Sequence, residues 1–135
     1  MLGFRIHTNA ESDIRGIAQA DPDGASYITE WLQEAAGDQR LLDDMCQVGE
    51  YSQRHPDDWV LNFSTKPWRD ERNRNLWRLR FHDLEDEGKS YRLIFGFVPR
   101  RKCIYVFGVC TRREMDYDGQ SDFRDRIGCD YDELC

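Results

Sequence analysis

A chain of 135 residues with 39% hydrophobic and 13% aromatic residues is long enough to bury one core but too short for two domains of ordinary size. Its formal net charge of -7 argues against unselective nucleic-acid binding, and no segment approaches the roughly 20 consecutive apolar residues of a membrane span. The first residues lack the apolar region of a signal peptide, so we expect a cytoplasmic protein with no membrane partner.

The charge is distributed unevenly along the chain. Residues 59–113 carry 13 basic and 6 acidic side chains, whereas the segments before and after them are net acidic. A basic middle between acidic ends favours an anionic ligand, or a basic surface that the acidic termini cover. The third interpretation is that these charged side chains are simply exposed to solvent and bind nothing.

The five cysteines do not predict a metal site. They are scattered, without a Cys-x-x-Cys pair or a neighbouring histidine cluster. We interpret Cys103 and Cys110 as core residues, and we expect neither a metal nor another cofactor.

The first 20 residues predict a short strand and a helix. Residues 4–8 alternate between apolar and polar side chains, as in a strand at the edge of a sheet. Residues 8–11 match a capping box, and the apolar positions that follow predict a short helix that ends before Asp21.

A stronger apolar stripe predicts a second helix. It runs from Tyr27 to Ala36 at helical spacing, and Gly37 is placed to end it. We expect this stripe to pack against Trp77, Leu79 and Phe81. A third short helix is expected to start near Asp38.

Residues 47–73 give the weakest pattern. Residues 49–58 are typical of a loop, and residues 59–63 of an extra strand or an apolar clasp. The charged residues 69–75 predict an exposed segment. The whole stretch is therefore interpreted as a surface insertion, with a mobile basic arm as the alternative.

Residues 76–110 predict three successive antiparallel strands. In residues 76–82 apolar and cationic side chains alternate, so Arg78, Arg80 and His82 share one face. A charged turn leads to the aromatic and branched residues 91–98, and a short polar connection leads to residues 103–110. The last of these is apolar almost throughout, which predicts a strand buried on both faces.

The polar face of these strands is predicted to carry Arg78, Arg80 and Arg92, with Arg112 at the exit of the last strand. We expect residues 1–117 to form one domain, with the insertion at residues 47–73. Residues 118–135 are expected to form an acidic tail or a short helix.

The order and spacing of these elements resemble the RelE/ParE toxin superfamily. The resemblance lies in residues 76–81, 91–95 and 104–117, and it covers most of the chain outside residues 47–73 and the acidic tail. It implies an α+β fold: a small antiparallel or mixed sheet of about four strands, with two or three N-terminal helices packed on one face.

Members of the RelE branch are ribosome-dependent mRNA endonucleases that an antitoxin neutralises, whereas the ParE branch lacks the nuclease residues and acts on DNA gyrase. The resemblance thus implies a metal-free endoribonuclease whose partners are a cognate antitoxin and mRNA on the ribosome. The pattern of the RelE branch falls on Arg78, Arg80, Tyr91, Arg92, Arg112 and, one residue early, Tyr117.

Metal-free cleavage by the neighbouring 2′-hydroxyl needs a base, cations at the phosphoryl transition state, and an acid for the leaving oxygen. Arginines suit the second task because their planar forks bind phosphate oxygens and stay charged. We assign phosphate binding to Arg78 and Arg92. Arg112 would bind phosphate or stabilise the leaving group, and Tyr117 would stack on or orient a base.

The general base stays unassigned at this stage. The related pattern has a lysine where this chain has Arg80, and an arginine effectively never gives up its proton. His82 is the natural substitute because its unperturbed pKa is about 6.5, and Glu85 and Glu87 are weaker candidates.

A structural interpretation of the same residues is also open. His82 would then be a solvated histidine at a strand end, and the arginines would form ion pairs with the acidic tail. The chain would be a non-catalytic protein-binding module of the same fold. Its net negative charge departs from proteins that work against ribosomal RNA, which are usually basic.

Overall fold

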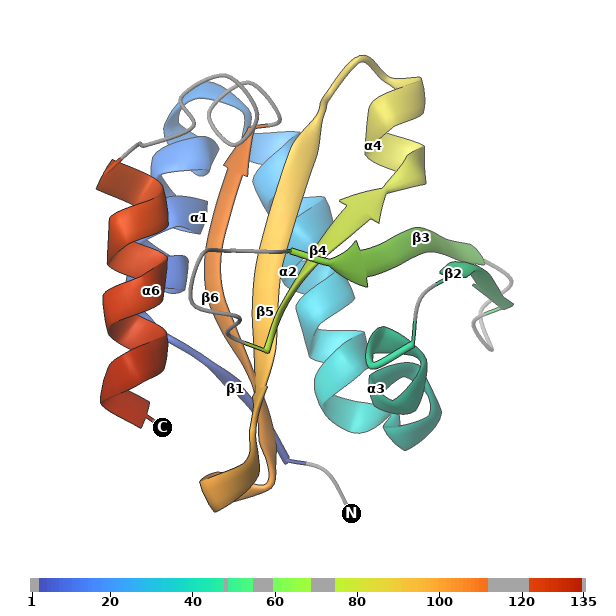
Figure 1. Cartoon of the computed structure of the whole chain (residues 1–135). Helices are drawn as coiled ribbons and strands as arrows, with labels where there is room; N and C mark the ends of the chain where they lie inside the picture. The colour runs from blue at the N-terminus through green and yellow to red at the C-terminus, as the bar shows by residue number, and fades with distance from the viewer. Residues whose placement is uncertain (1–2, 48, 55–59, 69–74, 112–121, 135) are drawn as a thin grey trace.

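The computed structural model describes residues 3–47, 49–54, 60–68, 75–111 and 122–134, and these form an α+β fold. Six strands form one mixed sheet in the order β1-β6-β5-β4-β3-β2 (Figure 1). The strands are β1 (Gly3–Ile6), β2 (Gly49–Arg54), β3 (Val60–Pro67), β4 (Leu76–Phe81), β5 (Tyr91–Val98) and β6 (Cys103–Thr111).

The strands β4, β5 and β6 form the expected antiparallel meander. A short 3-10 turn, η1 (Pro99–Arg101), joins β5 to β6, and Lys102 then takes a left-handed conformation with φ 50°. The N-terminal β1 pairs in parallel with the first half of β6, as the edge strand that its alternating pattern predicted.

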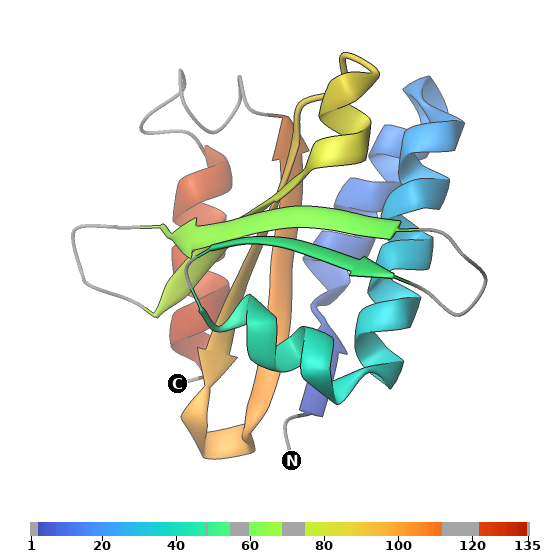
Figure 2. The same ribbon diagram turned by 90° about the vertical axis from the view of Figure 1, so that its right-hand side faces the viewer.

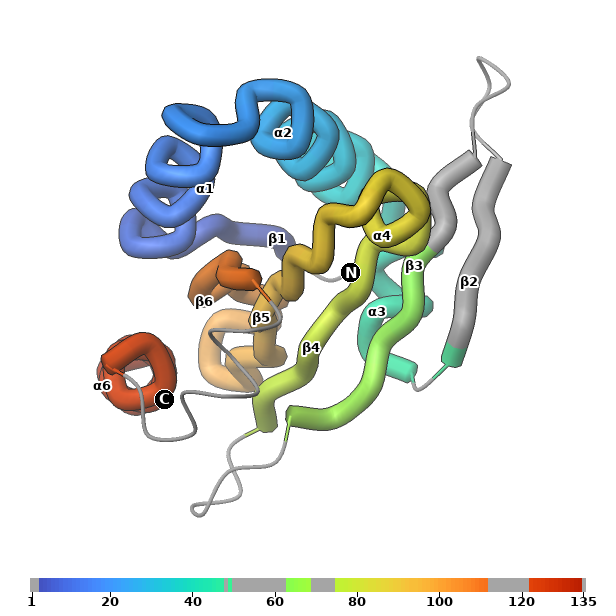
Figure 3. The backbone as a smooth tube through the Cα atoms, turned by 90° about the horizontal axis from the view of Figure 1, so that it is seen from above, coloured from blue at the N-terminus to red at the C-terminus, as the bar shows by residue number. Residues whose placement is uncertain are grey.

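Helices cover both faces of the sheet (Figure 3). On one face lie α1 (Thr8–Ala20), α2 (Pro22–Gly37) and α3 (Gln39–Met45), and on the other lies α6 (Asp122–Leu134). A short helix, α4 (His82–Asp86), follows β4 at one end of the sheet. The prediction of N-terminal helices on one face is confirmed.

The helix starts are set by polar side chains. Asp21 caps α2 by accepting a hydrogen bond from the Gly24 amide at 3.1 Å, and Asp38 caps α3 in the same way. The capping box predicted at residues 8–11 is wrong. The N-cap of α1 is His7, whose Nδ1 accepts from the Asn9 amide at 3.0 Å, so the helix begins at Thr8, one residue earlier than a Thr8 cap requires.

The larger core lies between α2 and the sheet. Trp31 is fully buried and meets Phe63 of β3 and Phe81 of β4 edge to face, with ring centroids 5.4 and 5.6 Å apart. Leu79 belongs to the same core and Trp77 packs against its margin. The expected packing of the second helix on this face of the meander is confirmed.

A second, smaller core lies under α6. Ile94 and Phe107 from the sheet pack there with Ile127 and Tyr131 from the helix. Gly108 of β6 allows this close approach, because a Cβ at that position would stand 2.7 Å from the Ile127 Cδ1 atom. The acidic tail or short helix expected for residues 118–135 thus contains a helix of 13 residues that packs on the sheet.

The helices α6 and α1 both lie beside the edge of β6 (Figure 1), and polar side chains join them there. Asp13 of α1 accepts two hydrogen bonds from Arg126 of α6, at 2.6 and 2.9 Å, and a third from the Val109 amide at 3.0 Å. Since β1 pairs only as far as Val106, this junction satisfies strand groups that no neighbouring strand reaches.

The sheet has six strands where about four were expected. The additional strands are β2 and β3, which form a hairpin within the segment interpreted as an insertion (Figure 2). The reason is that β3 pairs with β4 over five residues, so that Phe63 and Thr65 reach the buried face of the sheet. The segment is thereby part of the fold.

Candidate functional site

The candidate site is a row of side chains that crosses the sheet on the face that α6 partly covers. Arg80 of β4 stands opposite Arg92 of β5, with Ser64 of β3 on one side and Cys110 of β6 on the other. Directly opposed residues of neighbouring strands project from the same face. The register therefore brings Arg80 and Arg92 together, as the alternation predicted.

The next row along the strands adds further positive charge. Arg78 of β4 stands opposite Lys66 of β3, and Lys66 is exposed. Beyond them the guanidinium of Arg124, from α6, lies 4.9 Å above the Trp68 ring. Positively charged side chains thus extend from the first turn of α6, across β3 and β4, toward α4.

One carboxylate holds the two paired arginines. Glu85 of α4 accepts from the Nε and Nη2 atoms of Arg80 at 3.2 and 2.6 Å, and from Nη1 of Arg92 at 2.7 Å. The short helix turns the chain back over the strand ends, which brings Glu85 against residues five and seven positions away. We call Arg80, Arg92 and Glu85 the arginine–glutamate cluster.

The two arginines of the cluster differ in exposure. The side chain of Arg80 is 42% exposed, whereas that of Arg92 is 5% exposed and also donates to the Tyr91 carbonyl. The Glu85 side chain is 19% exposed and contacts both arginines. Arg80 is consequently accessible to an anion from solution, whereas Arg92 is almost completely buried.

Contacts with α2 fix the position of α4. Leu84 is buried in the larger core, and Asp83 accepts a hydrogen bond from the Tyr27 hydroxyl at 3.0 Å. Burial, together with this carboxylate, raises the pKa of Tyr27 far above its ordinary value, so the phenol keeps its proton. The helix that carries Glu85 is therefore firmly attached to the scaffold.

A second contact ties the start of β5 to the same corner. Asp21 accepts from the Tyr91 hydroxyl at 2.8 Å and forms an ion pair with Lys89 at 3.0 Å. Burial and the Asp21 hydrogen bond raise the pKa of Tyr91 to about 12. Tyr91, which the resemblance places at the opening of a site strand, thus has a structural contact here.

The other predicted site residues are placed as follows. His82 is the first residue of α4, and its Nε2 atom is buried without a hydrogen-bond partner among the described residues. The residue as a whole is half-buried. Arg112 and Tyr117 lie outside the described residues.

Glu85 is the residue whose importance the sequence understated. It stands in a run of acidic residues that is typical of an exposed turn, and nothing in its spacing indicates two arginine partners. The only available signal was its distance of three positions from His82, which places both on one side of a helical turn.

The charge of Glu85 is favoured at neutral pH. Burial opposes ionisation, but the hydrogen bonds and charges of Arg80 and Arg92 outweigh it and lower the pKa of Glu85 below 4.5. A carboxyl whose folded pKa is lowered stabilises the fold above its unfolded pKa, and this contribution is lost as the pH falls through the folded value.

We therefore expect the stability advantage of the wild type over Glu85→Gln to be constant above about pH 5.5 and to shrink as the pH falls below about 4.5. Urea unfolding of both proteins between about pH 3 and 7 measures it. A difference in unfolding free energy that stays the same at every pH would contradict the assigned ion pairs.

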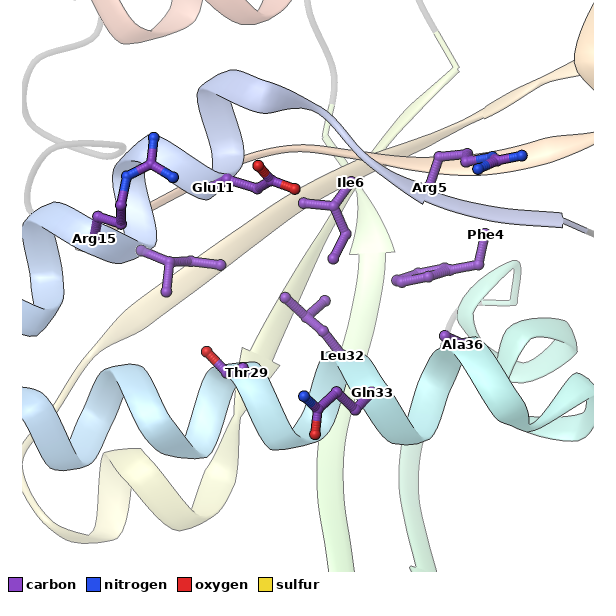
Figure 4. Close-up of a pocket in the computed structure, with 10 residues that line it drawn as sticks. Phe4, Arg5, Ile6, Glu11, Arg15, Thr29, Leu32, Gln33 and Ala36 are labelled. Carbon is purple, nitrogen blue, oxygen red and sulfur yellow. The ribbon is translucent and has the colours of Figure 1, made fainter.

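A separate cavity of about 580 Å³ lies on the other side of the sheet, between β1, α1 and α2 (Figure 4). Its walls are mainly apolar, with charged groups at the rim, and the lining residues are Phe4, Arg5, Ile6, Glu11, Ile14, Arg15, Thr29, Leu32, Gln33 and Ala36. None of them belongs to the arginine–glutamate cluster. The cavity and the cluster are thus different surfaces.

Among the residues that the structure describes, no group of three histidine, cysteine, aspartate or glutamate side chains is arranged to hold a metal ion. No helix in the same residues is long and apolar enough to cross a membrane. Comparisons with protein-family models, with curated proteins and with solved structures give no match to this chain. The function has to be inferred from the site itself.

Proposed function

We propose that the chain is a RelE-like endoribonuclease that cleaves mRNA on the ribosome and is neutralised by a cognate antitoxin. The observation that carries the proposal is the arginine–glutamate cluster, in which an ionised carboxylate lies within hydrogen-bond distance of two guanidinium groups. A base and two phosphate-binding cations are the groups that metal-free cleavage of RNA requires.

In the proposed reaction Glu85 takes the proton of the 2′-hydroxyl, and the 2′-oxygen forms a bond to the adjacent phosphorus. The bond from phosphorus to the 5′-oxygen breaks, leaving a 2′,3′-cyclic phosphate on one fragment. The 5′-oxygen of the other fragment takes a proton from solvent. Arg80 and Arg92 stabilise the negative charge that grows on the phosphoryl oxygens.

Glu85 replaces His82 as the preferred base. Its carboxylate already contacts both arginines, whereas the Nε2 atom of His82 is buried away from solvent. Arg78, half-buried in the next row, extends the phosphate-binding surface toward Lys66. Arg112 keeps its proposed role in binding phosphate or stabilising the leaving group, and Tyr117 keeps its role in stacking on or orienting a base.

A second function, a non-catalytic protein-binding module of the same fold, is favoured by one observation. Arg92 is buried, and its Nη1 atom donates to both Glu85 and the Tyr91 carbonyl, as in an ion pair that serves only the fold. In that case the exposed arginines would dock an acidic protein partner such as an antitoxin or a ParE-type target.

The test is cleavage of a translated message, mapped by primer extension with and without ribosomes. We expect the wild type to cut only with ribosomes present, and Glu85→Gln and Arg80→Gln each to reduce cutting at least about 100-fold. Arg100→Gln is the matched control, because Arg100 is an exposed arginine on η1 at the opposite end of the meander. It should cut as the wild type does.

Thermal unfolding must first show that each variant is folded. Undiminished cutting by folded Glu85→Gln would refute the glutamate as base, and undiminished cutting by Arg80→Gln would refute the phosphate contact. If the folded wild type makes no cuts, yet inhibits growth unchanged when His82 and Arg92 are both replaced, the binding module is the correct function.

A further inference from the structure

The carboxylate of Glu85 makes the contacts that a phosphate group would make in the same place. Arg80 donates from Nε and Nη2 to its two oxygens, which is the paired geometry in which guanidinium groups bind phosphate. Arg92 donates to Oε1 from the other side at 2.7 Å. A phosphodiester also presents two unsubstituted oxygens with one shared negative charge, so it can satisfy the same donors.

We propose that Glu85 is a built-in occupant of the RNA phosphate site, and that a phosphodiester displaces it from Arg80 and Arg92. This inference rests on the proposed endoribonuclease function and adds how its site is controlled. The free protein holds the site closed with its own carboxylate, and the substrate opens it.

The displacement needs only a side-chain movement. The backbone of α4 is fixed by buried Leu84 and by the hydrogen bond from Tyr27 to Asp83. The Glu85 side chain, by contrast, is partly exposed to solvent. Arg80 is exposed enough to meet a phosphate first. Rotation of Glu85 then uncovers Arg92, which completes the binding site.

The same exchange changes the chemistry of Glu85. The charged groups that lower its pKa are Arg80 on β4 and Arg92 on β5. Once both donate to a phosphate, the carboxylate loses its stabilising hydrogen bonds and becomes a stronger base beside the bound substrate. The base is thus generated by substrate binding and is weak in the empty site.

The test is the affinity for a 2′-O-methyl RNA oligonucleotide, which has no 2′-hydroxyl proton and is not cut, measured by fluorescence anisotropy at fixed salt. We expect Glu85→Gln to bind at least about tenfold more tightly than the wild type, because the competing carboxylate is gone. Asp86→Asn makes the same charge change at an exposed position of the same helix and should alter affinity less than about twofold.

Equal effects of the two substitutions, weaker binding by Glu85→Gln, or no binding by either protein would overturn the proposal. If Glu85→Gln is unfolded, a measurement on the wild-type protein still tests the proposal. The carboxyl carbon resonance of Glu85 should show a pKa that rises when the oligonucleotide is bound, and an unchanged pKa would refute displacement. Because the oligonucleotide is never cut, these results are independent of the cleavage assay, which alone tests the endonuclease.

Discussion

Replacing Trp31 with alanine should destabilise the protein by about 3–5 kcal/mol, which is a large part of the stability of a small domain. Trp31 is fully buried and lies edge to face with Phe63 and Phe81, so it joins α2 to two strands at once. Truncation leaves a cavity that rigid neighbours on the sheet cannot fill. The free energy of unfolding in urea measures the loss.

Trp31→Phe is the matched control for the size of the cavity. The Nε1 atom of Trp31 is buried and has no hydrogen-bond partner in the described part of the chain, so phenylalanine sacrifices packing but no hydrogen bond. It should cost about 1–2 kcal/mol, well below the alanine variant. Equal costs for the two variants would show that the site is not a tightly packed contact.

Asp13→Ala should be the second large effect, at about 2–4 kcal/mol. The substitution deprives Arg126 of a two-bond partner and leaves the Val109 amide without its acceptor. Since Asp13 and Arg126 belong to α1 and α6, we expect α6 to detach before the rest of the fold. Amide hydrogen exchange should show faster exchange in α6 than in α2, alongside a lower urea midpoint.

Asp125→Ala is the control for charge on α6, because Asp125 is exposed on the same helix. It should change stability by less than about 0.5 kcal/mol. If Asp13→Ala is equally mild, the junction does not hold α6, and the apolar contacts of Ile127 and Tyr131 are sufficient by themselves.

The meander and the N-terminal helices could be predicted because their patterns are local. Alternation in residues 76–81 fixes which side chains face the core, and the stripe from Tyr27 onward fixes the face of α2. Any compact fold has to bury the apolar faces of these elements, whatever their tertiary arrangement. Their existence therefore follows from the sequence, with errors confined to details such as the His7 cap.

The remaining elements depend on tertiary contacts. The strand β3 has a weak pattern by itself and is stabilised by its register with β4, through which Phe63 meets Trp31. The helix α4 is only five residues long, too short for local propensity to form it, and buried Leu84 and the Tyr27 contact hold it in place.

The site, too, has one part that local patterns predict and one part that depends on tertiary contacts. The pairing of Arg80 with Arg92 follows from alternation and strand order, and the structure has both in one row. The role of Glu85 does not follow, because it depends on the direction in which a short turn leaves β4. The structural interpretation pairs the arginines with the acidic tail, whereas among the described residues Arg80 and Arg92 form ion pairs with Glu85 of α4.

The second core has a consequence for the order in which the protein folds. The larger core uses only elements up to β6, whereas the smaller one needs α6, the last helix in the chain. During synthesis the first core can form while Ile94 and Phe107 are still uncovered. Until α6 has been synthesised, no helix covers this apolar face of the sheet, and we expect chaperone binding or aggregation to compete with the docking of α6.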